Sequence, residues 1–141
     1  SNSKDNLYYY VQYAHARISS VLRKMPYEQD TLKLKNFNDC KFDLLTNEYE
    51  INLIKKILDW NSIIETSVSL SEPHRIAYYL YELSGIFHSL WNQGKIDPSL
   101  RFIEIEDDDL SFARIALIYA TQRTIKSGLG LLGVSAPDEM Q

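Results

Sequence analysis

A tyrosine-rich stretch near the amino terminus carries the residue types best suited to grip a flat ligand. Tyr9, Tyr13 and Arg17 follow one another at intervals of four residues. Side chains spaced in this way on a helix lie about 5–6 Å apart on one face. Aromatic rings stack on unpaired nucleobases, and a guanidinium meets a base edge or a phosphate. The row therefore predicts a nucleobase-binding surface; the alternative interpretation is the rim of a buried core, with Arg17 extended toward water.

A second face of the same segment fixes how this row is presented. Apolar residues recur along it at helical spacing, and such a stripe faces the core. Its members are Leu7, Val11, Ala14, Ile18, Val21, Leu22 and Met25. The pattern predicts a helix over about 6–25 that ends before Pro26, because proline cannot continue a helix. The tyrosine row then lies beside the buried stripe.

The rest of the chain is also predicted to be helical, and no segment has the alternation of a strand. Residues 26–45 are expected to form a long connection, and Gly94 and Gly128 are expected to end helices, Gly128 as a left-handed cap. Apolar periodicity and cap residues, including a capping box from Asn47 to Glu50, predict further helices over 47–60, 61–68, 71–92 and 109–127. The predicted fold class is therefore all-α, a bundle of about five helices.

Composition limits the class of protein. The chain has 141 residues, 45% of them apolar and 24% charged, which is typical of one soluble globular domain. No apolar run approaches the roughly 20 residues of a membrane span, and none resembles a signal peptide. The single cysteine, Cys40, excludes an internal disulfide framework and suits a reducing cytoplasm. Ser1, Asn2 and Ser3 have the composition of a scar left by an expression tag.

Charge is unevenly distributed along the chain. The net charge is −4, but residues 1–41 carry a net +3 and the remainder carries −7. An acidic block over 104–109 would repel phosphate. A nucleic acid is therefore expected to approach over the amino-terminal helix, through a small number of phosphate contacts.

The sequence contains no pattern of a catalytic centre. It lacks a glycine-rich phosphate loop, a Cys/His metal cluster and a nucleophile elbow. His15, His74 and His88 fall on separate predicted helices and are interpreted as hydrogen-bonded structural or surface residues. We therefore predict no catalytic residue, no metal site and no cofactor in this chain.

Several blocks resemble the anticodon-binding domain of arginyl-tRNA synthetases, which are class I aminoacyl-tRNA synthetases. They occur in the family's order and span nearly all of the chain, at residues 10–18, 20–23, 72–77, 80–85, 87–92, 113–117, 128–129 and 131–137. The resemblance implies a helical anticodon-binding domain over residues 4–141. The family's catalytic motifs, of His-Ile-Gly-His and Lys-Met-Ser-Lys-Ser type, are missing, which implies a catalytic domain on the amino-terminal side.

The resemblance implies that the domain binds the anticodon loop of the transfer RNA for arginine. In the family a central cytosine enters a pocket whose residues match Tyr13, Arg17, Phe87 and Met140. Trp91 is expected to stack on a neighbouring base. Burial is the alternative for both aromatic residues of this helix, since Phe87 fits its apolar stripe and Trp91 fits the edge of the core. Two features depart from the family: Gln141 follows Met140, and two acids, Asp138 and Glu139, precede it.

The resemblance also describes the longer enzyme. It attaches arginine to its transfer RNA with ATP and Mg, in the cytoplasm, so this chain alone is expected to be inactive. The expected partners are the transfer RNA and the catalytic domain of the same enzyme. No interaction with a membrane is expected, and the expected oligomeric state is a monomer. Two alternatives remain open: a helical protein-interaction module with an aromatic hot-spot patch, and the anticodon-binding domain of another synthetase, such as the glycyl beta subunit.

Overall fold

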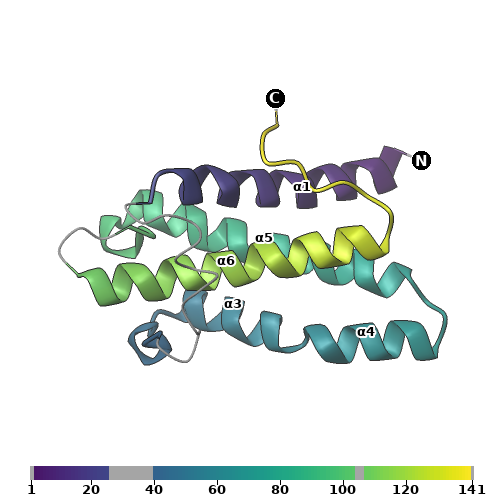
Figure 1. Cartoon of the computed structure of the whole chain (residues 1–141), viewed down its shortest axis with the longest axis horizontal. Helices are drawn as coiled ribbons and strands as arrows, with labels where there is room; N and C mark the ends of the chain where they lie inside the picture. Colours follow the sequence, from purple (N-terminus) through teal and green to yellow (C-terminus); the bar gives the residue numbers. More distant parts are fainter. Residues whose placement is uncertain (1, 26–39, 104–106, 141) are drawn as a thin grey trace.

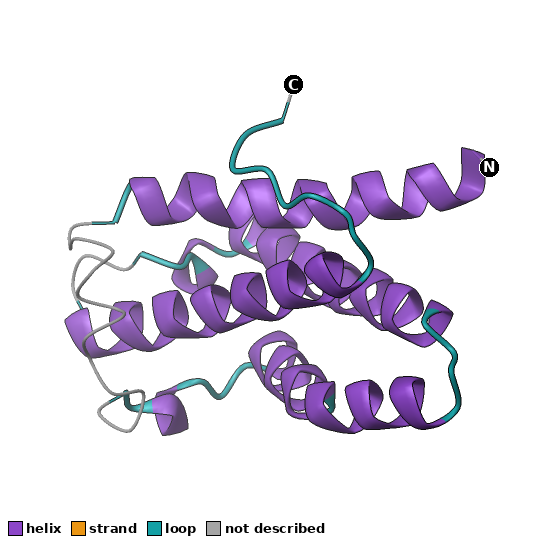
Figure 2. Ribbon diagram, turned by 45° about the vertical axis from the view of Figure 1, so that its right-hand side comes forward, coloured by secondary structure: helices purple, strands orange, loops and turns teal. Residues whose placement is uncertain are grey.

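The computed structural model describes residues 2–25, 40–103 and 107–140. In these residues five α-helices and two short 3-10 helices occur (Figures 1 and 2). They are α1 (Asn2–Arg23), η2 (Phe42–Leu44), α3 (Glu48–Leu58), α4 (Trp60–Ser69), α5 (His74–Ile96), η3 (Pro98–Leu100) and α6 (Asp108–Leu131). The predicted all-α bundle of about five helices is confirmed. Most of the predicted connection over 26–45 lies outside the described residues.

The long helices α5 and α6 form the centre of the bundle. Helix α1 packs on both of them, and α3 packs on both as well. Figure 1 shows α1 along one side of α5 and α6, with α3 and α4 along the opposite side. The surface of α1 that does not face the bundle is therefore covered only in part, by the carboxy-terminal segment.

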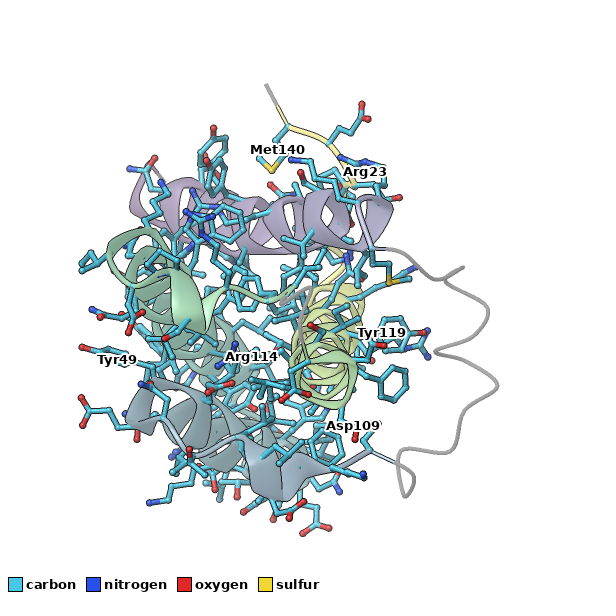
Figure 3. All side chains as sticks on the ribbon, turned by 90° about the vertical axis from the view of Figure 1, so that its left-hand side faces the viewer. Arg23, Tyr49, Asp109, Arg114, Tyr119 and Met140 are labelled. Carbon is cyan, nitrogen blue, oxygen red and sulfur yellow. The ribbon has the colours of Figure 1, made fainter. Side chains whose placement is uncertain are left out.

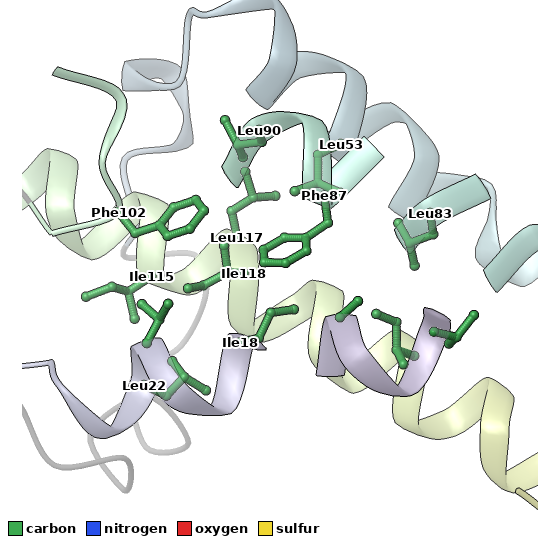
Figure 4. Packing of buried hydrophobic residues seen from close by; sticks show 14 of the residues in the cluster. Ile18, Leu22, Leu53, Leu83, Phe87, Leu90, Phe102, Ile115, Leu117 and Ile118 are labelled. Carbon is green, nitrogen blue, oxygen red and sulfur yellow. The ribbon is translucent and has the colours of Figure 1, made fainter. Parts of the chain in front are cut away.

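The apolar stripe predicted on α1 is buried. Val11, Ala14 and Ile18 have no exposed surface, and Leu22 is almost fully buried. They pack in one cluster with residues of α5 and α6, of which Figure 4 shows a part, including Phe87 and Ile118. Burial of this stripe fixes the rotation of α1 about its axis. That rotation determines which way the tyrosine row faces.

The start of α3 combines a correct and an incorrect prediction. The side chain of Asn47 accepts a hydrogen bond of 2.9 Å from the Tyr49 backbone N–H, as expected for a helix cap. Glu50 does not reach back to complete a capping box. Its carboxylate is buried and accepts a hydrogen bond of 3.1 Å from Nε of Arg114. A distant arginine therefore replaces the local partner.

Gly94 and Gly128 do not end helices, contrary to the prediction. Gly94 lies within α5 and Gly128 within α6, and both are buried. The glycine with a positive φ, 71°, is Gly133. A Cβ atom on Gly128 would lie 2.7 Å from both Cδ atoms of Leu80. Gly128 therefore permits the close approach of α5 and α6, which local sequence patterns do not reveal.

Gly128→Ala is expected to destabilise the bundle by about 1–3 kcal/mol, because an added methyl group must displace the fully buried Leu80. Thermal or denaturant unfolding measures the effect. Gly130→Ala is the matched control on the same helix: no atom lies within 4 Å of the added Cβ. That substitution is expected to be neutral or to stabilise by up to about 1 kcal/mol. Equal stability of the two variants would contradict the proposed role of Gly128.

Candidate functional site

A surface hollow of about 630 Å³ lies between α1, α5 and the carboxy-terminal segment. Four residues that the sequence analysis selected, from three separate parts of the chain, meet there. The lining residues are Tyr13, Ala16, Arg17, Ser20, Arg23, Trp91, Asp138, Glu139 and Met140. We refer to this feature as the Tyr13 hollow.

The guanidinium of Arg17 is held by three side chains. Its Cζ lies 4.8 Å from the ring centre of Tyr13 and 4.6 Å from that of Trp91. Nη2 donates a hydrogen bond of 3.1 Å to the Tyr13 hydroxyl. Nη1 lies 3.0 Å from Nδ1 of His88. Arg17 is therefore fixed in place at the edge of the hollow, and its position does not depend on a ligand.

Tyr13 presents an aromatic surface to solvent. Its side chain is 40% exposed, and that of Tyr9 is 51% exposed. The two rings stack with centroids 6.5 Å apart and planes inclined by 27°. An exposed ring beside an arginine is a suitable platform for a planar ligand.

His88 is the member of the site that the sequence analysis missed. The sequence indicates a hydrogen-bonded structural or surface histidine, and the 71 positions between Arg17 and His88 give no sign of their contact. The ring is buried, and burial, together with the Arg17 guanidinium, lowers the pKa of His88 to about 4, although the Tyr10 carbonyl opposes this. His88 is therefore neutral near pH 7. Because a guanidinium only donates, Nδ1 accepts the Arg17 hydrogen bond and Nε2 carries the proton. Nε2 is buried and has no hydrogen-bond partner among the described residues.

The carboxy-terminal segment 133–140 crosses the outer side of α1, as Figures 1 and 3 show. Side chains of α1 bind it at successive turns. Nε2 of Gln12 donates to the Ser135 carbonyl and Nδ1 of His15 to the Pro137 carbonyl, each over 2.9 Å. Ser19 donates to the Asp138 carboxylate over 2.9 Å, and Arg23 donates to its carbonyl over 3.3 Å. These bonds place Met140 beside the Tyr13 hollow.

Phe87 does not line the hollow, contrary to the expectation that it contacts a base there. The side chain has no exposed surface. Its ring stacks on Phe102, with centroids 6.0 Å apart, and contacts His88 at 5.5 Å. Phe87 lies on the buried stripe of α5 (Figure 4), and it contacts His88 from the core side.

A second hollow, of about 450 Å³, lies on the far side of Trp91 and Ser20. Most of its wall is apolar, and Lys24, Lys95 and Arg101 stand at it. None of the described residues that line it is acidic. The Tyr13 hollow, by contrast, contains two acids, Asp138 and Glu139, beside its two arginines. Among the described residues, the lining of the second hollow is therefore the more positive of the two.

The described part of the chain contains no group of three or more His, Cys, Asp or Glu side chains arranged to hold a metal ion. Within residues 2–25, 40–103 and 107–140, no helix combines the length and the apolar character of a membrane span.

Comparisons with known proteins give a consistent result. The family described as the DALR anticodon binding domain matches residues 11–140. The arginine–tRNA ligase of Roseobacter denitrificans is 45% identical over 144 residues, and that of Brucella anthropi is 44% identical over 143 residues. Each alignment covers 99% of this chain and 24% of the relative. The chain thus spans about a quarter of the length of these curated relatives.

Two solved structures share the fold. The arginyl-tRNA synthetase of Thermus thermophilus matches with a TM-score of 0.66 and 27% identity, over 93% of this chain and 21% of that chain. A Campylobacter jejuni protein assigned as an arginyl-tRNA synthetase matches with a TM-score of 0.73, over 97% of this chain and 27% of that chain. Its 22% identity supports the fold alone.

Proposed function

The chain belongs to the DALR anticodon-binding domain family, and on that basis we propose that it binds the anticodon loop of the transfer RNA for arginine. The observation that carries this proposal is the Tyr13 hollow. An exposed aromatic ring, a fixed guanidinium and the chain's last residues converge there on one open space. A single unpaired base of the loop enters this space.

The chemistry of the hollow favours cytosine. Tyr13 stacks on the base, and Met140 covers it from the side of the carboxy-terminal segment. The Watson–Crick edge of cytosine presents two adjacent acceptors, O2 and N3, which match the parallel N–H donors of a guanidinium. In uracil N3 carries a hydrogen, so it is a donor and would face the N–H donors of the guanidinium, which is unfavourable. Arg17 therefore reads the difference between the two bases.

The strand continues past Trp91. The Tyr13 hollow sets two acids, Asp138 and Glu139, against two arginines, whereas the second hollow carries three cations and no acid among its described lining residues. A neighbouring base stacks on Trp91, and its phosphates lie near Lys24, Lys95 and Arg101. The small number of cations implies a limited dependence of binding on salt.

The longer enzyme acts through a part beyond this chain. The matched relatives are arginine–tRNA ligases about four times its length. We propose that the full-length protein is a cytoplasmic monomer that joins arginine to its transfer RNA with ATP and Mg. In it, this domain holds the anticodon loop so that the acceptor end reaches the catalytic domain. By itself the chain binds RNA and activates no amino acid.

The test compares two hairpin RNAs that differ only in the central loop base, cytosine or uracil. The chain is expected to bind the cytosine hairpin about tenfold more tightly, which is within the range for one well-matched pair of hydrogen bonds. Fluorescence anisotropy at fixed salt measures both dissociation constants. Equal binding of the chain to the two hairpins would refute the proposed recognition. So would a chain that binds neither hairpin and binds a protein partner instead.

Tyr13→Ala is expected to weaken binding of the cytosine hairpin by about 1–3 kcal/mol, because the stacking platform is lost, and to remove the preference over uracil. Tyr78→Ala is the matched control. Tyr78 is also an exposed tyrosine, 60% exposed, and it contacts His74 on α5 away from the hollow. The control variant is expected to bind like the parent, and equal losses in the two variants would argue against a specific stack.

A further inference from the structure

His88 occupies a closed position behind the Tyr13 hollow. Its ring lies 4.9 Å from that of Tyr10, 5.8 Å from that of Tyr13 and 5.5 Å from that of Phe87. Only 9% of the residue is exposed. A ring packed among three others cannot turn freely, so the direction of its Nδ1 lone pair is fixed by the core.

That lone pair sets the rotation of the Arg17 guanidinium. The rings of Tyr13 and Trp91 both lie against the guanidinium, so its stacking positions are taken by protein. One N–H is given to His88 and one to the Tyr13 hydroxyl. What a ligand can reach is the remaining N–H edge. The direction of this edge depends on the two anchors, of which only His88 is buried.

We propose that His88 is a specificity-determining positioning residue for base recognition by Arg17. Its neutral ring accepts from Nη1 and holds the free N–H edge of the guanidinium toward the hollow, in the orientation that suits two adjacent acceptors. A base with O2 and N3 acceptors is bound, and a base with a hydrogen on N3 is rejected. This inference rests on the proposed function and adds the residue that sets its selectivity.

The environment keeps His88 in the required state. If the ring were protonated, both nitrogens would donate, so Nδ1 could no longer accept the hydrogen bond from Arg17. The positive charge of the ring would also repel the Arg17 guanidinium. Burial and the cation beside it lower the pKa of His88 to about 4, so the neutral form prevails at physiological pH. The acceptor is therefore always present when the domain meets RNA.

The test uses the ratio of affinities for the cytosine and uracil hairpins. His88→Leu removes the acceptor but keeps an apolar side chain, and the ratio is expected to fall from about tenfold to within about twofold. His88→Asn places an amide oxygen near the position of Nδ1 and is expected to retain most of the preference. A residue that served only the stability of the bundle would change both affinities together and leave the ratio intact.

The outcomes separate this inference from the proposed function. A folded His88→Leu variant with the parent's ratio would overturn the role of His88 and leave anticodon binding untouched. A parent chain without any preference would instead refute the proposed recognition. If His88→Leu fails to fold, nitrogen NMR of the parent chain still tests the inference, because it reports which nitrogen of His88 carries the proton. The Nε2–H tautomer supports the inference, and the Nδ1–H tautomer or an imidazolium near pH 7 overturns it.

Discussion

Glu50→Ala is expected to lower the free energy of unfolding by about 3–5 kcal/mol, the typical cost of removing one partner from a buried ion pair. Glu50 and Arg114 are 1% and 5% exposed. Nε of Arg114 donates to the Glu50 carboxylate over 3.1 Å. Without this carboxylate the guanidinium stays in the bundle as an uncompensated charge.

Arg114 extends the effect beyond the pair itself. Its Nη1 donates to the carbonyl of Ser99 over 2.7 Å and to that of Arg101 over 3.0 Å. The arginine, labelled in Figure 3, thus ties α3 and α6 to η3 and to Arg101, which follows η3. Loss of Glu50 is therefore expected to loosen the wall of the second hollow as well.

Thermal unfolding checks this prediction, with an expected fall in midpoint of roughly 10 °C for a domain of this size. Glu82→Ala is the matched control. Glu82 pairs with Lys56 over 2.7 Å, but its side chain is 61% exposed. Its loss is expected to cost less than about 1 kcal/mol. If both substitutions had the same small effect, burial would not be what makes the Glu50–Arg114 pair important.

Arg17→Ala is expected to weaken binding of the cytosine hairpin about 100-fold. A hydrogen bond to a charged group contributes about 1.5–3 kcal/mol, and the cation's contacts with the aromatic rings are lost as well. The variant also leaves the Tyr13 and His88 side chains without the group that they hold. Isothermal titration or anisotropy at constant salt measures the loss.

Two further variants separate charge from geometry. Arg75→Ala makes the same change in net charge at an exposed arginine that pairs with Glu72 on another part of the surface, and it is expected to bind like the parent. Arg17→Lys keeps the charge but lacks the planar fork of donors. It is expected to retain part of the affinity and to lose the preference for cytosine. A lysine variant with full preference would show that charge alone is read.

Local features were predictable from the sequence. The spacing of Val11, Ala14 and Ile18 determined which face of α1 is buried, and the four-residue interval brought Tyr13 and Arg17 together. Both relations lie within one helix, where geometry follows directly from sequence separation. The all-α class followed for the same reason, since each long segment carried its own helical period.

The partners of these residues were decided by the tertiary structure. Periodicity placed Phe87 on the apolar stripe of its helix, but it did not decide between burial in the core and contact with a base. Gly128 was expected to end a helix, whereas it meets Leu80 inside one. Arg17 and His88 lie 71 positions apart, and Gln12 and Ser135 lie 123 apart. A helical pattern shows which face of a helix is buried. It does not show which other helix packs there or which residues of the two helices lie opposite each other. These contacts are set by the packing of α1 on α5 and of the carboxy-terminal segment on α1. The same packing brings the residues of the site together.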